Sequence, residues 1–138
     1  MISKIAQALL GGMLFFAGLG HLTVQREEFQ AQVPPWLPLD EDFVVVASGV
    51  VEMGLGSALL LIWRQPRRAL LGAVVALFFV AIFPGNIAQY LEHRDAFGLD
   101  TDTKRGVRLL FQPLLVLWAL FATDTIGTWR QLRSTARA

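Results

Sequence analysis

The chain has 138 residues, of which 54% are hydrophobic and 17% are charged. Soluble domains carry about a quarter charged residues, so this composition is typical of a protein whose surface faces lipid. The net charge of +1 and the lack of a long basic block argue against a nucleic-acid-binding protein. The absence of cysteine excludes disulfides, a catalytic thiolate, and zinc or iron–sulfur sites held by cysteines of this chain.

Four apolar segments follow one another along the chain, at residues 5–22, 43–63, 69–90 and 107–127. Each is about 18 to 22 residues long, which as a helix matches a hydrocarbon core of about 30 Å. None shows the period-two alternation of a barrel strand, and only helices and closed barrels satisfy the backbone in lipid. We therefore predict an all-α membrane protein with a single domain over residues 1–138, folded as an antiparallel, up-down bundle of four transmembrane helices.

Arginine and lysine favour one orientation of this bundle. The turn at 64–68 carries three arginines and no acid, whereas the loops on the other side hold most of the acids. The side of the two chain ends collects Lys4, Arg64, Arg67, Arg68, Arg130, Arg133 and Arg137. Because positive residues concentrate in cytoplasmic loops, we expect both termini in the cytoplasm.

The connecting loops differ in kind. The short turn at Gln65-Pro66 predicts that the second and third helices are antiparallel neighbours. The loop at 23–42 contains a proline-rich stretch in which Trp36 suits an interfacial anchor, and a short interfacial helix is expected around residues 25–32. The loop at 92–106 is polar.

Polar side chains interrupt all four apolar segments. They are His21, Glu52, Asn86, Gln89, Arg108 and Gln112. A carboxylate such as that of Glu52 costs several kcal/mol in hydrocarbon unless it is paired, protonated or hydrated. In the predicted topology these residues all fall in the outer half of the bundle, while the inner half is almost purely apolar. We expect them to form a shared polar pocket.

Helical spacing supports this convergence. Small residues and a polar residue share one face in the first two segments, as Gly11, Gly18 and His21 and as Gly49, Glu52 and Gly56. Small residues let helices approach closely, so these faces should point into the bundle. Pro84 and Pro113 each remove one backbone hydrogen bond close to the polar residues.

Each polar residue has a structural and a functional interpretation. Glu52 either joins helices, protonated or paired with arginine, or exchanges a proton and binds a ligand. His21 either caps the first helix or donates to a polar head group. Arg108 either extends to the interface or pairs with Glu52 or an anionic ligand.

The amides Asn86, Gln89 and Gln112 either connect helices or contribute to ligand binding. Metal binding is not expected, because His93 is the only other histidine and no spacing matches a metal site.

Five short motifs in chain order resemble the DoxX family of small four-helix membrane proteins. They are Ala-Gly-Leu-Gly-His at 17–21, Val-Pro-Pro-Trp-Leu-Pro at 33–38, Ser-Gly-Val-Val-Glu at 48–52, Phe-Pro-Gly-Asn-Ile at 83–87 and Arg-Leu-Leu-Phe-Gln at 108–112. The last departs from the family pattern, since Leu110 stands where a proline is expected. The resemblance implies a multi-pass protein of the bacterial plasma (inner) membrane that is associated with oxidoreductases, because relatives include small subunits of a thiosulfate:quinone oxidoreductase.

These observations lead to a functional expectation. The chain is expected to be a redox-associated membrane subunit that binds a quinone or another amphipathic molecule. His21, Asn86 and Gln112 would hold its polar end, with Gln89 and Arg108 as further candidates, and Glu52 would exchange a proton. A protein partner would supply electrons, and whether the chain itself catalyses a reaction stays open.

Two alternatives have different partners. A non-enzymatic anchor or scaffold would use the polar groups only to join helices. A small transporter or lipid carrier would require a homo-oligomer, because four helices enclose little volume. Membrane lipid is an expected partner in each case, and a protein partner or a second copy of the chain is expected beside it.

Overall fold

The computed structural model describes residues 1–138 and is built from helices without any strand. The helices are α1 (Ile2–Leu22), α2 (Arg26–Gln30), α3 (Glu41–Leu61), α4 (Arg67–Leu91), α5 (Asp102–Ala122) and α6 (Thr125–Arg137). Four of them, α1, α3, α4 and α5, are long and apolar enough to cross a membrane. The prediction of an all-α fold is therefore confirmed, and four helices of this length and composition indicate a multi-pass membrane protein.

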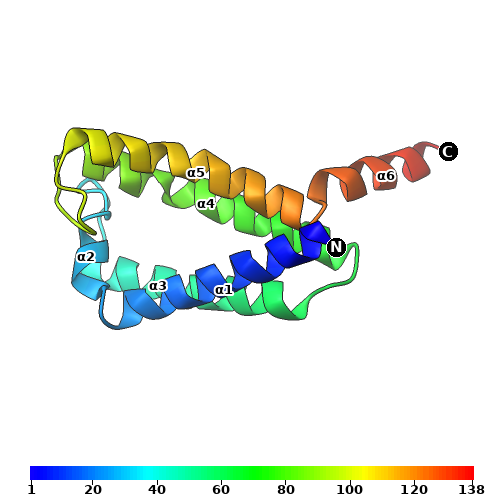
Figure 1. The fold of residues 1–138 in the computed structure, drawn as a ribbon, viewed down its shortest axis with the longest axis horizontal. Helices are drawn as coiled ribbons and strands as arrows, with labels where there is room; N and C mark the ends of the chain where they lie inside the picture. The colour runs from blue at the N-terminus through cyan, green and yellow to red at the C-terminus, as the bar shows by residue number, and fades with distance from the viewer.

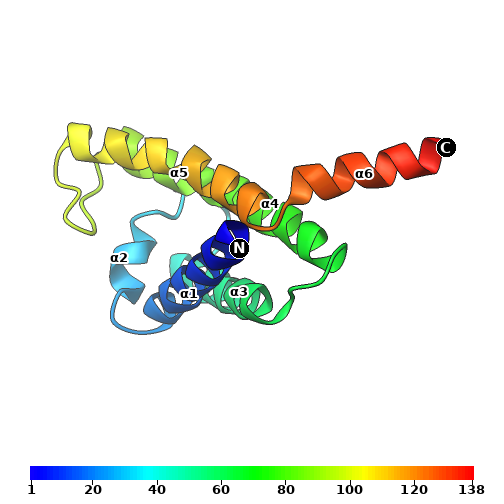
Figure 2. The ribbon, with the colours of Figure 1, turned by 45° about the vertical axis from the view of Figure 1, so that its right-hand side comes forward.

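The four long helices form two pairs. Helix α1 packs mainly on α3, and α4 packs mainly on α5. The pairs approach each other where the chain begins and diverge toward α2 (Figures 1 and 2). We call the end with both chain termini and the turn at 62–66 the terminal end, and the opposite end the α2 end.

The second and third helices, predicted to be antiparallel neighbours, share only a small contact. Helices α3 and α4 are joined by the short turn, but they contact each other far less than each contacts its own pair partner. A short turn brings together only the two helix ends that it joins, whereas lateral packing depends on the shapes of the helix faces.

Glycines explain why α1 packs on α3. A Cβ atom on Gly18 would lie 2.5 Å from the carbonyl oxygen of Gly49, and one on Gly56 would lie 2.5 Å from the backbone nitrogen of Phe15. Gly11 faces the same interface, where a Cβ would lie 3.0 Å from the carbonyl oxygen of Gly56. The two backbones approach so closely that a side chain at Gly18 or Gly56 would displace the backbone of the partner helix.

The fourth long helix differs from its predicted bounds of 107–127. Helix α5 begins earlier, because the side chain of Thr101 accepts a hydrogen bond from the backbone of Lys104 at its first turn. It ends at Ala122, and Asp124 then takes the left-handed conformation with a φ of 52°. The remaining residues form the separate helix α6, which the sequence analysis did not predict.

The hydrophobic core lies where the two pairs meet. It consists of Leu10, Leu14, Leu59, Leu71, Val75, Ala76, Phe79 and Ala119. Many large apolar side chains remain exposed on the outward faces, among them Leu9, Phe16, Val50, Leu61, Leu77, Val80, Leu114 and Phe121. A soluble protein rarely exposes so many large apolar side chains, so these faces are suited to lipid.

The predicted short helix in the first loop is present as α2. The guanidinium of Arg26 forms an ion pair with Asp42 of α3, and this hydrogen-bonded pair raises the pKa of Arg26. The chain after α2 crosses to the other helix pair, where the carbonyl oxygen of Gln32 would lie 2.1 Å from a Cβ on Gly85. Helix α2 and its following loop therefore bridge the two pairs at the α2 end.

Candidate functional site

A cavity of about 370 Å³ lies between the two helix pairs toward the α2 end. It is lined by 22 residues, 13 of them hydrophobic, from α1 through α5 and the loop after α2. The polar lining residues are His21, Gln32, Ser48, Glu52, Arg108 and Gln112. An apolar chamber with a few polar groups has the character of a small-molecule site.

One wall of the cavity, from α1 and α3, carries a histidine and a carboxylate. The Nε2 atom of His21 lies 3.4 Å from Oε2 of Glu52, and both side chains are buried. This approach is not aligned as a hydrogen bond, and neither atom has another hydrogen-bond partner. The two groups therefore keep unused hydrogen-bonding capacity at the cavity wall.

The other nitrogen of His21 indicates which tautomer faces Glu52. Nδ1 lies 3.0 Å from the hydroxyl of Ser48 and 3.3 Å from the carbonyl oxygen of Val45. Since the Ser48 hydroxyl donates its own proton to Val45, Nδ1 is assigned as the protonated nitrogen. A neutral His21 then presents the lone pair of Nε2 to the acceptor oxygen of Glu52, which is unfavourable. Either a proton shared by these two atoms or a hydrogen-bond donor on a ligand would remove this repulsion.

The opposite wall, from α4 and α5, carries two amides and an arginine. Asn86 donates to Oε1 of Gln112 at 3.1 Å, and Arg108 donates to the same oxygen at 3.3 Å. Gln112 donates to the carbonyl oxygen of Phe79 at 2.7 Å, close to where Pro84 interrupts the hydrogen bonding of α4. Arg108 forms no ion pair with any carboxylate of the chain.

The predicted site residues divide into three groups. His21, Glu52, Arg108 and Gln112 line the cavity, while Asn86 lies behind Gln112 and is hydrogen-bonded to it. Gln89 does not line the cavity. It accepts a hydrogen bond from Gln32 and donates to the carbonyl of residue 94, so it positions the two loops at the α2 end.

The structure adds residues that the sequence analysis did not assign to the site. Phe29 of α2 packs against the ring of His21 and also lines the cavity, as does Trp36 from the proline-rich loop. Ser48 also lines the cavity and contacts His21. Its position one helical turn before Glu52 was a signal in the sequence that it could lie at the site. No comparable signal existed for Phe29 and Trp36, because their placement depends on the fold of the loop at 23–42.

The expectation that the inner half of the bundle is almost purely apolar is wrong. Gln7 is fully buried near the terminal end and donates to the carbonyl oxygens of Leu59 and Ile62, at 2.7 and 2.9 Å. Arg68, also buried, donates to Oε1 of Gln7 at 2.5 Å and to the carbonyl oxygen of Ala122 at 2.6 Å. This second polar cluster connects α1, α3, α4 and the end of α5.

Comparisons with known proteins identify the family. No curated protein and no solved structure matches the chain. One family model matches residues 10–123, and it is described as a domain of unknown function (DUF8561).

The resemblance to the DoxX family is therefore wrong, since its short motifs of small and polar residues also fit another family of membrane helices. The expectations of an oxidoreductase partner and a bacterial plasma membrane lose their support with it. The match extends from α1 to the end of α5 and includes the whole cavity, so the chain belongs to the DUF8561 family.

Proposed function

We propose that this protein binds one amphipathic small molecule in the cavity between its two helix pairs. The observation that carries the proposal is the cavity itself, which places His21 and Glu52 on one wall and Arg108 and Gln112 on the other. A volume of about 370 Å³ lies within the range of about 300 to 1,000 Å³ that is common for ligand sites. The apolar lining suits the body of the ligand, and the polar groups suit its head.

The polar groups indicate what the head of this ligand carries. The Oε2 atom of Glu52 and Nε2 of His21 are buried and lack hydrogen-bond partners, and such groups cost about 1 to 3 kcal/mol each. A hydroxyl or amine on the ligand would supply the missing donor. Arg108 would donate to a carbonyl, carboxylate or phosphate oxygen across the cavity. A head with both donor and acceptor groups fits best, as in a quinol or a monoacyl lipid.

We further propose that the terminal end lies in the cytoplasm. Its side chains include seven lysines and arginines, and the only acidic side chain there is Asp124. The acids of the α2 end would then face the opposite side of the membrane. In this orientation the cavity lies in the outer half of the bundle.

Replacing Glu52 by glutamine is expected to release the bound molecule while the fold is kept. The amide has nearly the same shape, but it cannot share a proton with His21 or carry a negative charge. Loss of a hydrogen bond to a charged group corresponds to about a tenfold or larger drop in retention. The measurement is mass spectrometry of small molecules extracted from the wild type and from Glu52→Gln, both purified in mild detergent.

The matched control is Glu92→Gln, which removes one carboxylate from an exposed position outside the cavity. A single species bound at near one per chain in the wild type and in Glu92→Gln, but not in Glu52→Gln, supports the proposal. If all three proteins carry the same bulk lipids, the cavity is not a binding site, and Glu52 serves to join helices in an anchor protein.

A further inference from the structure

A second hollow lies at the terminal end, between the start of α4 and α6. It has a volume of about 290 Å³. The residues that line it include Arg67, Leu70 and Ala73 of α4 and Trp129 and Leu132 of α6. We call it the α4–α6 groove. It is separate from the cavity of the proposed function, with which it shares no lining residue.

Helix α6 presents an apolar side to this groove and a basic side next to it. Trp129 and Leu132 line the groove, whereas Arg130 and Arg133 belong to a neighbouring stripe of the helix. The guanidinium carbon of Arg133 lies 5.5 Å from the ring centre of Trp129, within the range of a cation–π contact. A helix with this division is typical of one at a membrane interface.

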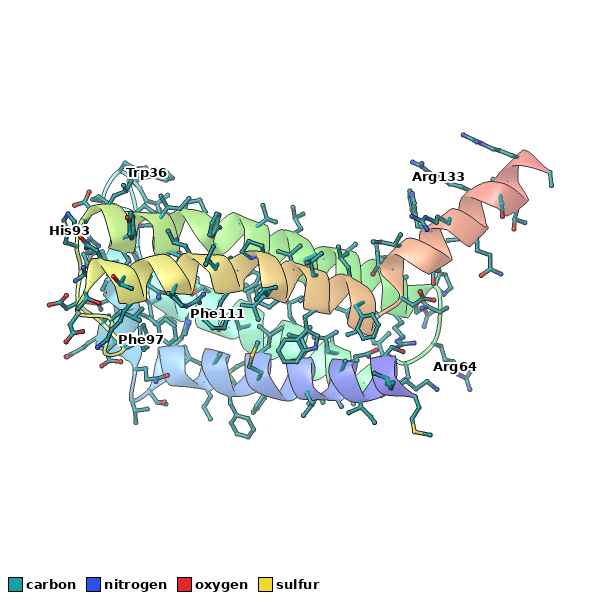
Figure 3. The ribbon with its side chains drawn as sticks, turned by 45° about the horizontal axis from the view of Figure 1, so that its top comes forward. Trp36, Arg64, His93, Phe97, Phe111 and Arg133 are labelled. Carbon is teal, nitrogen blue, oxygen red and sulfur yellow. The ribbon has the colours of Figure 1, made fainter.

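The charge around the groove is strongly positive. Arg67 lines the groove and is exposed, and it forms no hydrogen bond or ion pair through its side chain. Figure 3 shows Arg64 and Arg133 at this same end of the molecule, opposite Trp36, His93 and Phe97. With Asp124 as the only acidic side chain nearby, the positive charges here are not neutralised within the chain.

We infer that the α4–α6 groove binds an anionic phospholipid from the adjacent membrane leaflet. Its phosphate would lie against Arg67, and an acyl chain would run along Leu70, Ala73 and Leu132. The unpaired arginines attract an anionic head, while the apolar lining favours an acyl chain over a free anion. The inference does not depend on the proposed function, because the groove and the cavity lie in different parts of the bundle.

The test measures which phospholipids stay bound to the intact protein. Phosphatidylglycerol and phosphatidylcholine with identical acyl chains are added to the delipidated protein, and native mass spectrometry counts the bound molecules. We expect phosphatidylglycerol to be retained in preference. Arg67→Gln should reduce its retention about fivefold, the change expected from losing the attraction of one arginine. The control Arg137→Gln removes the same charge from the far end of α6 and should have little effect.

Two results would overturn this inference. Equal retention of the two lipids would show that the head group is not recognised, and equal effects of the two arginine substitutions would show a diffuse attraction without a site. Ala73→Phe provides a second variant, because the ring fills the groove from an exposed position of α4. Retention of phosphatidylglycerol should fall in this variant, and unchanged retention would place the lipid elsewhere.

Discussion

Replacing Gly18 by alanine is expected to destabilise the protein by about 2 to 3 kcal/mol. The new methyl group would lie 2.5 Å from the carbonyl oxygen of Gly49 and 2.8 Å from the backbone nitrogen of Met53. Because these are backbone atoms, the clash is relieved only if α1 and α3 move apart, and overpacking of this kind typically costs about 1 to 3 kcal/mol. The measurement is the free energy of unfolding in detergent, from denaturant titration.

The same helices provide matched controls for this substitution. A Cβ atom on Gly12 of α1 or on Gly54 of α3 would meet no heavy atom within 4 Å. Gly12→Ala and Gly54→Ala should leave the stability unchanged or raise it by up to about 1 kcal/mol, because alanine is the better helix former. Equal stability of Gly18→Ala and the two controls would contradict the close packing of α1 on α3.

Replacing Gln7 by leucine is expected to destabilise the protein by about 2 to 4 kcal/mol. Leucine has a similar volume, but the change removes three hydrogen bonds, two of them fully buried. Two are donated to the carbonyls of Leu59 and Ile62 at the end of α3, and one is accepted from Arg68. It also leaves a buried guanidinium without its closest acceptor, and hydrogen bonds to charged groups contribute about 1.5 to 3 kcal/mol. The midpoint of thermal unfolding in detergent measures the loss.

Ser3→Ala is the comparison for this second substitution. Ser3 accepts a longer bond of 3.2 Å from Arg68 and is only half-buried, in the first turn of α1. Its removal should cost less than about 1 kcal/mol. A similar unfolding midpoint for Gln7→Leu and the wild type would show that the polar cluster at the terminal end does not hold the four helices together.

The sequence was sufficient to predict the four long helices. A continuous apolar run of this length without alternation can cross lipid only as a helix. The side-chain caps at Asp40 and Thr101 explain why α3 and α5 begin earlier than predicted. It also predicted that His21 and Glu52 face the interior of the bundle. Glycine spacing placed His21 and Glu52 on packed faces, and the structure brings them within 3.4 Å.

The arrangement of the pairs could not be predicted in the same way. The divergence of the two pairs depends on how α2 and the proline-rich loop bridge them, and this bridge rests on contacts far apart in the sequence, such as Gln32 with Gln89. The roles of Gln7 and Arg68 were also missed. Both lie near the ends of apolar segments, where polar side chains commonly reach the interface, and only the fold shows that they are buried.

The most direct test of the central claim fills the cavity and asks whether the ligand is lost. Ala17 lines the cavity on α1, and Ala17→Phe would place a ring in it; Val74→Phe adds the same ring to an exposed face of α4 outside it. Native mass spectrometry of the intact proteins, released from the membranes in which they were made, measures the mass bound to each chain. We predict one bound molecule per chain in the wild type and in Val74→Phe, and none in Ala17→Phe. A bound mass that persists unchanged in Ala17→Phe, or a wild type that carries none, would contradict the account.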